Sequence, residues 1–280
     1  MVWRKTFLII CFFILKNECG FSQFQEVSAG IGGALYFGDL SPDNAFKNNS
    51  LIRLSAGASF SHHWNNRLAI KASLIKMLIA GSDDYTNNSG RNLSFQSNIW
   101  EFSVNGELYL LKWNPAEGYN FTLYGSIGAA VFYHNPKALY QGKWYSLQPL
   151  HTEGQGTPSF PDRKPYSRFQ IAIPLIGGIK VKLSDQINVF IEFGPRITFT
   201  DYLDDVSKTY PVESELGDFA AKLSYRGNEK TFPPKPFPAG TPRGNPGIND
   251  YYFNGLVGIS YSLDNLFDGI KNKRVKCPTF

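Results

Sequence analysis

Hydrophobic and polar residues alternate with a period of two along most of the chain, and no comparable stretch repeats with the period of an α-helix. In the stretch WEFSVNGELYL at 100–110, Trp100 and Phe102 fall on one face while Glu101 and Ser103 fall on the other. Such alternation is typical of a strand with one apolar and one polar face. We predict strands at 26–38, 51–64, 67–80, 97–112, 120–134, 167–183, 187–201 and 251–263.

The connections between these segments alternate strictly in length. Short turns at 65–66, 114–120 and 184–186 follow strands two, four and six, and long polar loops at 39–50, 81–96, 135–166 and 202–250 follow the others. Most segments are longer than the strands of soluble proteins and fit a tilted membrane crossing, which places about 9–11 residues in the bilayer. The pattern predicts an all-β fold, an eight-stranded antiparallel up-and-down transmembrane β-barrel with long extracellular loops.

Aromatic residues gather beside the connections, where two girdles are expected at the membrane surfaces. Trp64 and Trp113 lie beside short turns, and a larger set lies beside the long loops: Tyr36, Phe37, Phe132, Tyr133, Phe199, Tyr202, Tyr251 and Tyr252. The alternative interpretation is the aromatic core of a soluble β domain.

Charged residues recur on the polar face of the predicted strands. In an eight-stranded barrel this face lines an interior wide enough only for side chains, where charges must be paired. We predict a plug of ion pairs, and hence a closed barrel, from Arg53, Lys71, Glu101, Glu107, Lys180, Lys182, Glu192 and Arg196.

The two ends of the chain differ from the barrel segments. A basic start, an apolar run and small residues up to Ser22 predict a cleaved signal peptide at 1–22, followed by the barrel at 23–263. Cys277 would then be the one cysteine left, so no internal disulfide is expected. The tail at 264–280 would leave the barrel on the periplasmic side. Its cations, Lys271, Lys273, Arg274 and Lys276, would contact lipid phosphates, remain solvated or dock to a partner.

Five stretches in order resemble the PorG-type outer-membrane barrels of the type IX secretion and gliding-motility machinery of Bacteroidota. They are YFGDLSP (36–42), FQSNIWEFSVNGEL (95–108), FYHNPKALYQGKWYSLQPLHTEGQG (132–156), YSRFQIAIPLIGGIKVKL (166–183) and EFGPRITFTDYLDDVSKTY (192–210). Paralogous barrels share these features.

The resemblance implies an integral protein of the bacterial outer membrane that acts as a structural scaffold, without enzymatic activity or cofactor. The partners it implies are a periplasmic ring lipoprotein with its soluble partner, and the outer-membrane translocon as a further candidate. We also expect contact with outer-membrane lipid and lipopolysaccharide. No basic patch with interleaved aromatics is present, so nucleic acid is not an expected partner. Two alternatives remain open: a lipid-modifying barrel enzyme, and a general adhesion or stabilising barrel.

The loops carry the remaining candidate chemistry. His134 and His151, with Ser146 and Glu153, are the residue types that a lipid-modifying enzyme would need, if they meet within hydrogen-bond reach. An acidic cluster lies at the loop roots, at Asp39, Asp201, Asp204 and Asp205, together with Glu153. These acids would fix the loops, bind calcium or contact a partner. We assign no catalytic, cofactor or metal residue, and expect the Pro-rich run at 232–242 to be an extended recognition segment.

Overall fold

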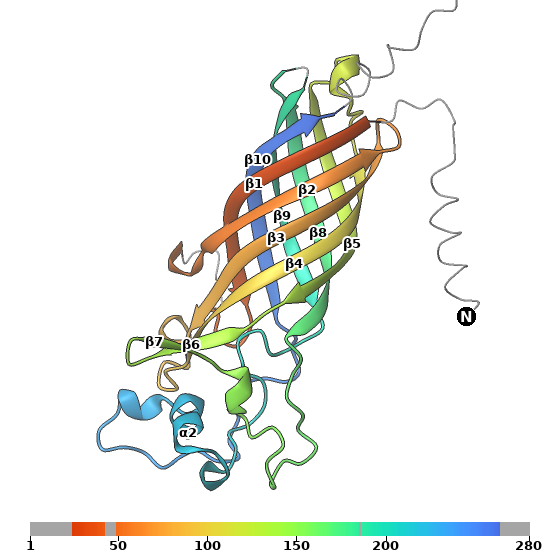
Figure 1. Cartoon of the computed structure of the whole chain (residues 1–280). Helices are drawn as coiled ribbons and strands as arrows, with labels where there is room; N and C mark the ends of the chain where they lie inside the picture. The colour runs from red at the N-terminus through yellow and green to blue at the C-terminus, as the bar shows by residue number, and fades with distance from the viewer. Residues whose placement is uncertain (1–23, 43–48, 185, 264–280) are drawn as a thin grey trace, which may run out of the picture.

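The computed structural model describes residues 24–42, 49–184 and 186–263. Eight antiparallel strands close into a tilted barrel, with the short turns at one end and the long loops at the other (Figure 1). Around the wall they follow the order β3-β2-β1-β10-β9-β8-β5-β4, and β3 pairs with β4 to close the circle. The predicted barrel is confirmed. The predicted signal peptide and C-terminal tail lie outside the described residues.

Each barrel strand lies on one of the predicted segments, with ends that differ by a few residues. The strands are β1 (Phe24–Phe37), β2 (Arg53–His63), β3 (Leu68–Ser82), β4 (Ser94–Tyr109), β5 (Phe121–Tyr133), β8 (Phe169–Lys182), β9 (Ile187–Thr198) and β10 (Tyr251–Ser262). Among the residues described, no helix combines the length and the apolarity that a membrane-crossing helix needs.

Two of the long loops contain structure that the sequence pattern does not predict. The loop after β5 forms a hairpin of β6 (Pro136–Tyr140) and β7 (Lys143–Ser146), and β6 also pairs with the start of β4. The loop after β9 holds the helix α2 (Asp218–Ser224). Short 3-10 turns complete the chain: η2 (Asn49–Leu51), η3 (Asp83–Tyr85), η4 (Pro115–Glu117), η5 (Gln148–Leu150), η6 (Glu213–Glu215) and η7 (Gly227–Glu229). The folded loops together form a cap over the lower end of the barrel in Figure 1.

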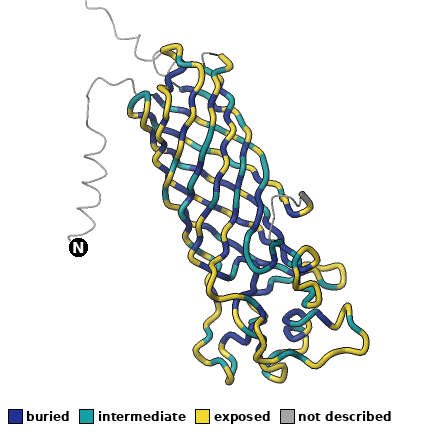
Figure 2. Tube along the Cα trace, turned by 180° about the vertical axis from the view of Figure 1, so that it is seen from behind, coloured by how far each residue is buried: buried dark blue, intermediate teal, exposed yellow. Residues whose placement is uncertain are grey.

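More buried and more exposed positions alternate along most of each barrel strand, which gives the wall the lattice of dark and light segments in Figure 2. In β4, Ile99 and Glu101 are fully buried, whereas Trp100 and Phe102 are about half exposed, at 47% and 54%. An apolar outer surface on this scale is unfavourable in water and suits the hydrocarbon of a bilayer.

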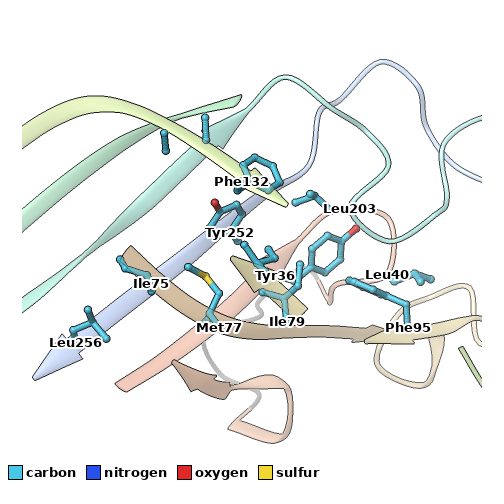
Figure 3. Close-up of a cluster of buried hydrophobic side chains, with 14 of the residues drawn as sticks. Tyr36, Leu40, Ile75, Met77, Ile79, Phe95, Phe132, Leu203, Tyr252 and Leu256 are labelled. Atoms are coloured by element: carbon cyan, nitrogen blue, oxygen red, sulfur yellow. The ribbon is translucent and has the colours of Figure 1, made fainter. Parts of the chain in front are cut away.

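The buried apolar side chains of the barrel form two large groups. Figure 3 shows the larger group, where Tyr36, Phe132 and Tyr252 from the wall meet Leu203 from the cap. A smaller group at the short-turn end is built from Phe24, Ala69, Tyr109, Trp113 and Tyr124. Polar and charged side chains lie beside both groups, and Lys71 Nζ is 5.9 Å from the centroid of the Phe190 ring, which belongs to the larger group.

The predicted aromatic girdles are wrong for several residues. Trp113, Tyr36, Phe132 and Tyr252 are fully buried. Strand parity points the last three into the barrel, and Trp113, in the short turn after β4, donates from Nε1 to the interior Glu26. Tyr202 belongs to the cap. The remaining members lie on the outer face: Trp64, Phe199 and Tyr251 are exposed, and Phe37 and Tyr133 are half-buried.

Candidate functional site

An ion-pair network surrounds Lys71 in the barrel interior. Its Nζ lies 2.5 Å from Glu192 Oε2 and 3.4 Å from Glu107 Oε1. Two phenols complete the carboxylate contacts: Tyr124 donates to Glu192 at 2.8 Å, and Tyr109 donates to Glu107 at 2.6 Å. Buried charges are stable only when paired and hydrogen-bonded in this way.

The network continues toward the short-turn end through Lys180. Its Nζ donates to Glu26 Oε2 at 2.6 Å and to the Tyr109 hydroxyl at 3.0 Å. Glu26 also contacts His63 Nε2 at 3.0 Å and accepts from Trp113 Nε1 at 3.3 Å. Glu26 was not among the residues predicted for the plug, although its inward parity in β1, shared with Ser28 and Gly30, is the signal that would have identified it.

A second group lies toward the cap. Arg196 Nε is 3.4 Å from Glu101 Oε2, and the Tyr252 hydroxyl donates to that same oxygen at 2.7 Å. Arg196 also donates to the backbone oxygens of Gly194 and Asn254, at 2.9 and 3.4 Å.

Two of the eight residues predicted for the plug lie at the rims instead. Arg53 is partly exposed and donates to the backbone oxygens of Ser50 and Ile52 at 2.6 and 3.2 Å. Lys182 Nζ donates to Pro115 O at 2.8 Å beside a short turn. Both residues have inward parity, but they lie too near the strand ends to reach the buried carboxylates. The other six fill the interior with side chains.

The cap is organised around Arg243, which is only 1% exposed. Its guanidinium lies 3.2 Å from Glu153 Oε1 and 3.5 Å from Asp205 Oδ2, donates to Ser224 O at 3.2 Å, and also donates to Asp205 O. Glu153 in turn accepts from the backbone N–H groups of Ser207 and Lys208 at 2.8 and 3.1 Å. These contacts join the loop after β5 to the loop after β9.

Arg91 is the centre of a second set of contacts, which joins the loops after β1 and β3 to the contacts of Arg243. We call Arg243 and Arg91 the hub arginines of the cap. Arg91 pairs with Asp83, with Nη2 to Oδ1 at 2.7 Å, and donates to Asp39 O at 3.1 Å and to Arg243 O. Neither hub arginine is predicted from the sequence, because neither lies in a strand or a motif.

The structure brings the predicted loop-root acids into one region of the cap. Asp204 and Asp250, the latter not predicted, lie on either side of the Tyr36 hydroxyl at 2.7 and 3.0 Å. Each also accepts a backbone N–H, from Val206 and from Leu203 respectively. A phenol has one hydrogen, so only one of the two carboxylates can accept it. The geometry therefore favours a proton on the other, and burial raises the pKa of both groups.

The remaining loop-root acids have different partners. Asp205 accepts from Tyr166 at 2.7 Å and from Thr152, and burial raises its pKa to about 6. Burial raises the pKa of Asp201 to about 7, and the nearby charges of Asp39 and Glu153 add to the shift. The carboxylates of Asp204, Asp205 and Glu153 accept from phenols, an arginine or backbone N–H groups, and these contacts hold the loops together. Among the described residues, no group of three or more metal-ligating side chains is placed to hold an ion.

The four loop residues considered for catalysis each have their own contacts in the folded loops. His134 is fully buried, stacks on Tyr166, and contacts Ser167 O at 3.2 Å. Burial lowers the pKa of His134 to about 4. His151 ends the turn η5 in a left-handed conformation with φ 52°. Ser146 contacts the Asn135 amide at 3.2 Å, and Glu153 is the acceptor at the centre of the cap. These contacts are those of folded loops.

The outer face of the cap carries a groove of about 840 Å³ between α2 and the Pro-rich run. Tyr140, Tyr225 and Phe237 lie in it, and Glu213, Asp218 and Lys222 lie among its exposed edges. Beside it, Phe232 is 96% exposed, and the run from Phe232 to Pro236 projects into solvent.

Comparisons with solved structures find similar chains at low sequence identity. The Ail protein of Yersinia pestis, solved with a heparin analogue, is 9% identical, with 86% of this chain and 98% of that chain covered and a TM-score of 0.40. The outer membrane protein OprG from Pseudomonas aeruginosa is also 9% identical, with 86% and 96% covered and a TM-score of 0.40. Neisserial surface protein A is 8% identical, with 85% and 95% covered and a TM-score of 0.37.

At such identities the likeness concerns the fold alone. No curated protein matches the sequence. The profile of the family described as a domain of unknown function, DUF6089, matches residues 4–220, most of the chain. The chain therefore belongs to the DUF6089 family, and its fold is that of an eight-stranded outer-membrane β-barrel.

Proposed function

We propose that this barrel is a non-enzymatic scaffold of a type IX protein secretion system, which anchors a periplasmic ring to the outer membrane. The observation that carries the proposal is the interior. Buried ion pairs around Lys71, Lys180 and Arg196 occupy it together with two apolar groups, so the barrel is built to be stable rather than to conduct.

The stretches that resemble PorG-type barrels support the same conclusion. YFGDLSP carries Tyr36 and Asp39, and EFGPRITFTDYLDDVSKTY carries Arg196 and the acids at 201–205. These residues lie in the interior near the cap and in the cap itself, rather than only on lipid-facing strands. The resemblance thus includes the specialised part of the fold.

The test is affinity purification of the full-length protein from its native cells in mild detergent, with identification of the bound proteins. The proposal predicts recovery of the ring lipoprotein and its soluble partner. A chain truncated after Leu263 should keep the folded barrel and lose both, because the basic residues at 271–276 are the proposed contact. Recovery of lipopolysaccharide alone would refute the scaffold role.

A general adhesion role is the second candidate, favoured by the exposed groove and by Phe232 on the outer face of the cap. It predicts that deletion of the gene abolishes attachment of cells to a surface or glycan while secretion continues. The lipid-modifying alternative predicts altered outer-membrane lipids in the same deletion strain, which mass spectrometry of extracted lipids would detect.

A further inference from the structure

The lipid-facing surface of the eight described strands contains one charged residue. Their outward positions carry apolar side chains almost throughout, with polar exceptions close to the strand ends such as Gln25, His62 and Asn98. Lys76, in the middle part of β3, is exposed and is the one Lys, Arg, Asp or Glu at these outward positions. A cation on the lipid face of a barrel destabilises it by an amount that grows with depth, so an unpaired lysine there needs an explanation.

The side chains around Lys76 form an ordered row across the wall. Lys76 pairs in register with Trp100 on β4, and its Nζ lies 5.1 Å from the centroid of the indole ring. Trp100 pairs in register with Tyr133 on β5. Arg168, just before β8, donates from Nη1 to the Tyr133 hydroxyl at 3.3 Å. A cation therefore lies at each end of an aromatic pair.

The end of the row formed by Tyr133 and Arg168 lies at the extracellular boundary of the apolar surface. Tyr133 is the last residue of β5, and Arg168 immediately precedes β8, so both are at the loop end of the barrel. On β4 the next outward position toward the loops is the exposed Asn98. Trp and Tyr at such a boundary bridge hydrocarbon and headgroups.

The row has no anionic partner among the described residues. No salt bridge joins Lys76 or Arg168 to a carboxylate in that part of the chain, and Glu101, next to Trp100 in sequence, points inward to Arg196. The anions available to a side chain at this depth outside the barrel are the phosphate groups of lipids, which attract lysine and arginine near the membrane surface.

We propose that Lys76 and Arg168, separated by Trp100 and Tyr133, form a binding site for a phosphate-bearing lipid of the outer leaflet, such as lipid A. The ammonium and guanidinium groups, at opposite ends of the row, each bind a phosphate group of the lipid, and the two rings support the sugar and upper acyl chains between them. The site is independent of any role in secretion, since it depends only on the barrel and its membrane boundary.

The experiment uses the full mature chain in mild detergent and measures bound lipid by native mass spectrometry during titration with lipid A. Lys76→Gln and Arg168→Gln should each weaken binding about fivefold, the effect of about one membrane-surface cation. Lys76→Arg should retain binding. Lys112→Gln is the matched control, because Lys112 Nζ lies 5.7 Å from the Tyr119 ring in a similar cation–aromatic contact beside a short turn. It should bind as the wild type does.

Two further measurements test whether the lipid's own phosphate groups are recognised and whether a loss of binding comes from the lost charge or from unfolding. Lipid A stripped of its phosphates should bind the wild type as weakly as lipid A binds Lys76→Gln, and inorganic phosphate should not displace lipid A. Lys76→Leu removes the charge without disturbing an apolar surface, so it should keep the heat-dependent gel mobility of a folded barrel and lose lipid. The proposal would be overturned if Lys76→Gln bound lipid A as tightly as the wild type does, or if the wild type bound lipid A and its phosphate-free form equally well. The proposal would also be overturned if Lys76→Gln or Arg168→Gln lost a co-purifying acidic protein while lipid binding stayed intact, because that result would indicate a protein partner.

Discussion

Substitution of Arg243 by methionine should open the cap while the barrel stays folded. The guanidinium is buried against Glu153 and Asp205, and methionine fills a similar volume without the charge or the donors. The change leaves two carboxylates in an enclosed region without their cation. Both belong to loops, so the damage should be confined to the cap.

The expected cost follows from burial. Removal of one partner from a buried ion pair costs about 3–5 kcal/mol, because the remaining charge is left uncompensated. A local opening reaction that becomes easier by this amount is populated roughly two to four orders of magnitude more often. An exposed pair behaves differently: Lys230 and Asp84 are 2.5 Å apart, but their side chains are 42% and 60% exposed. Lys230→Met should cost less than about 1 kcal/mol.

Tryptic cleavage after Lys208 measures this opening. The Lys208 N–H donates to Glu153, and its carbonyl accepts from the Arg243 N–H at 2.7 Å, so the bond can enter a protease only after the loop detaches. Cleavage at this bond should accelerate strongly in Arg243→Met and little in Lys230→Met. Heat-dependent gel mobility reports the barrel separately. Unchanged cleavage, or loss of the folded barrel in Arg243→Met, would show that the hub has been misidentified.

Three further changes test the interior, the wall and the pH response. Lys71→Met leaves Glu192 without its cation and should lower barrel stability by about 3–5 kcal/mol, seen as a lower temperature for the heat-dependent gel shift; an unchanged temperature would contradict the plug. Gly194→Ala should prevent folding or lower that temperature, because a Cβ at this position would lie 1.8 Å from Leu175 O on the neighbouring strand; normal refolding would contradict the packing. The raised pKa of Asp201, about 7, means that the folded cap prefers its protonated form. That stabilisation is full below the ordinary carboxyl pKa and is lost as pH rises through about 7, so proteolysis of the cap should accelerate from pH 5 to 9. Asp201→Asn should make this profile shallower, with the rest of the slope left to Asp204, Asp205 and Asp250, and a profile identical to the wild type would refute the assignment.

The local pattern was enough to predict the barrel. Each residue of a strand points to the opposite side from its neighbours, so alternation records which positions meet lipid and which meet the interior. Alternation alone therefore places six charged residues inside: Lys71, Glu101, Glu107, Lys180, Glu192 and Arg196. The same rule applied without allowance for the rims misplaced Arg53 and Lys182, and the preference of aromatics for membrane surfaces misplaced Trp113 and Tyr36.

The partners inside the interior and the cap required the tertiary structure. Arg243 and Glu153 are 90 residues apart in sequence, and Tyr36 and Asp250 are 214 apart. No local period links such residues, since their distance depends on strand order, shear and the paths of long loops. A barrel with a charged, closed interior can be predicted from the sequence, because each residue's side of the strand follows from its position in the alternation. The single cap around Arg243, and the place of Lys76 as the one charged lipid-facing residue of the described strands beside Trp100, emerge only in the folded chain, because both depend on which strands and loops become neighbours.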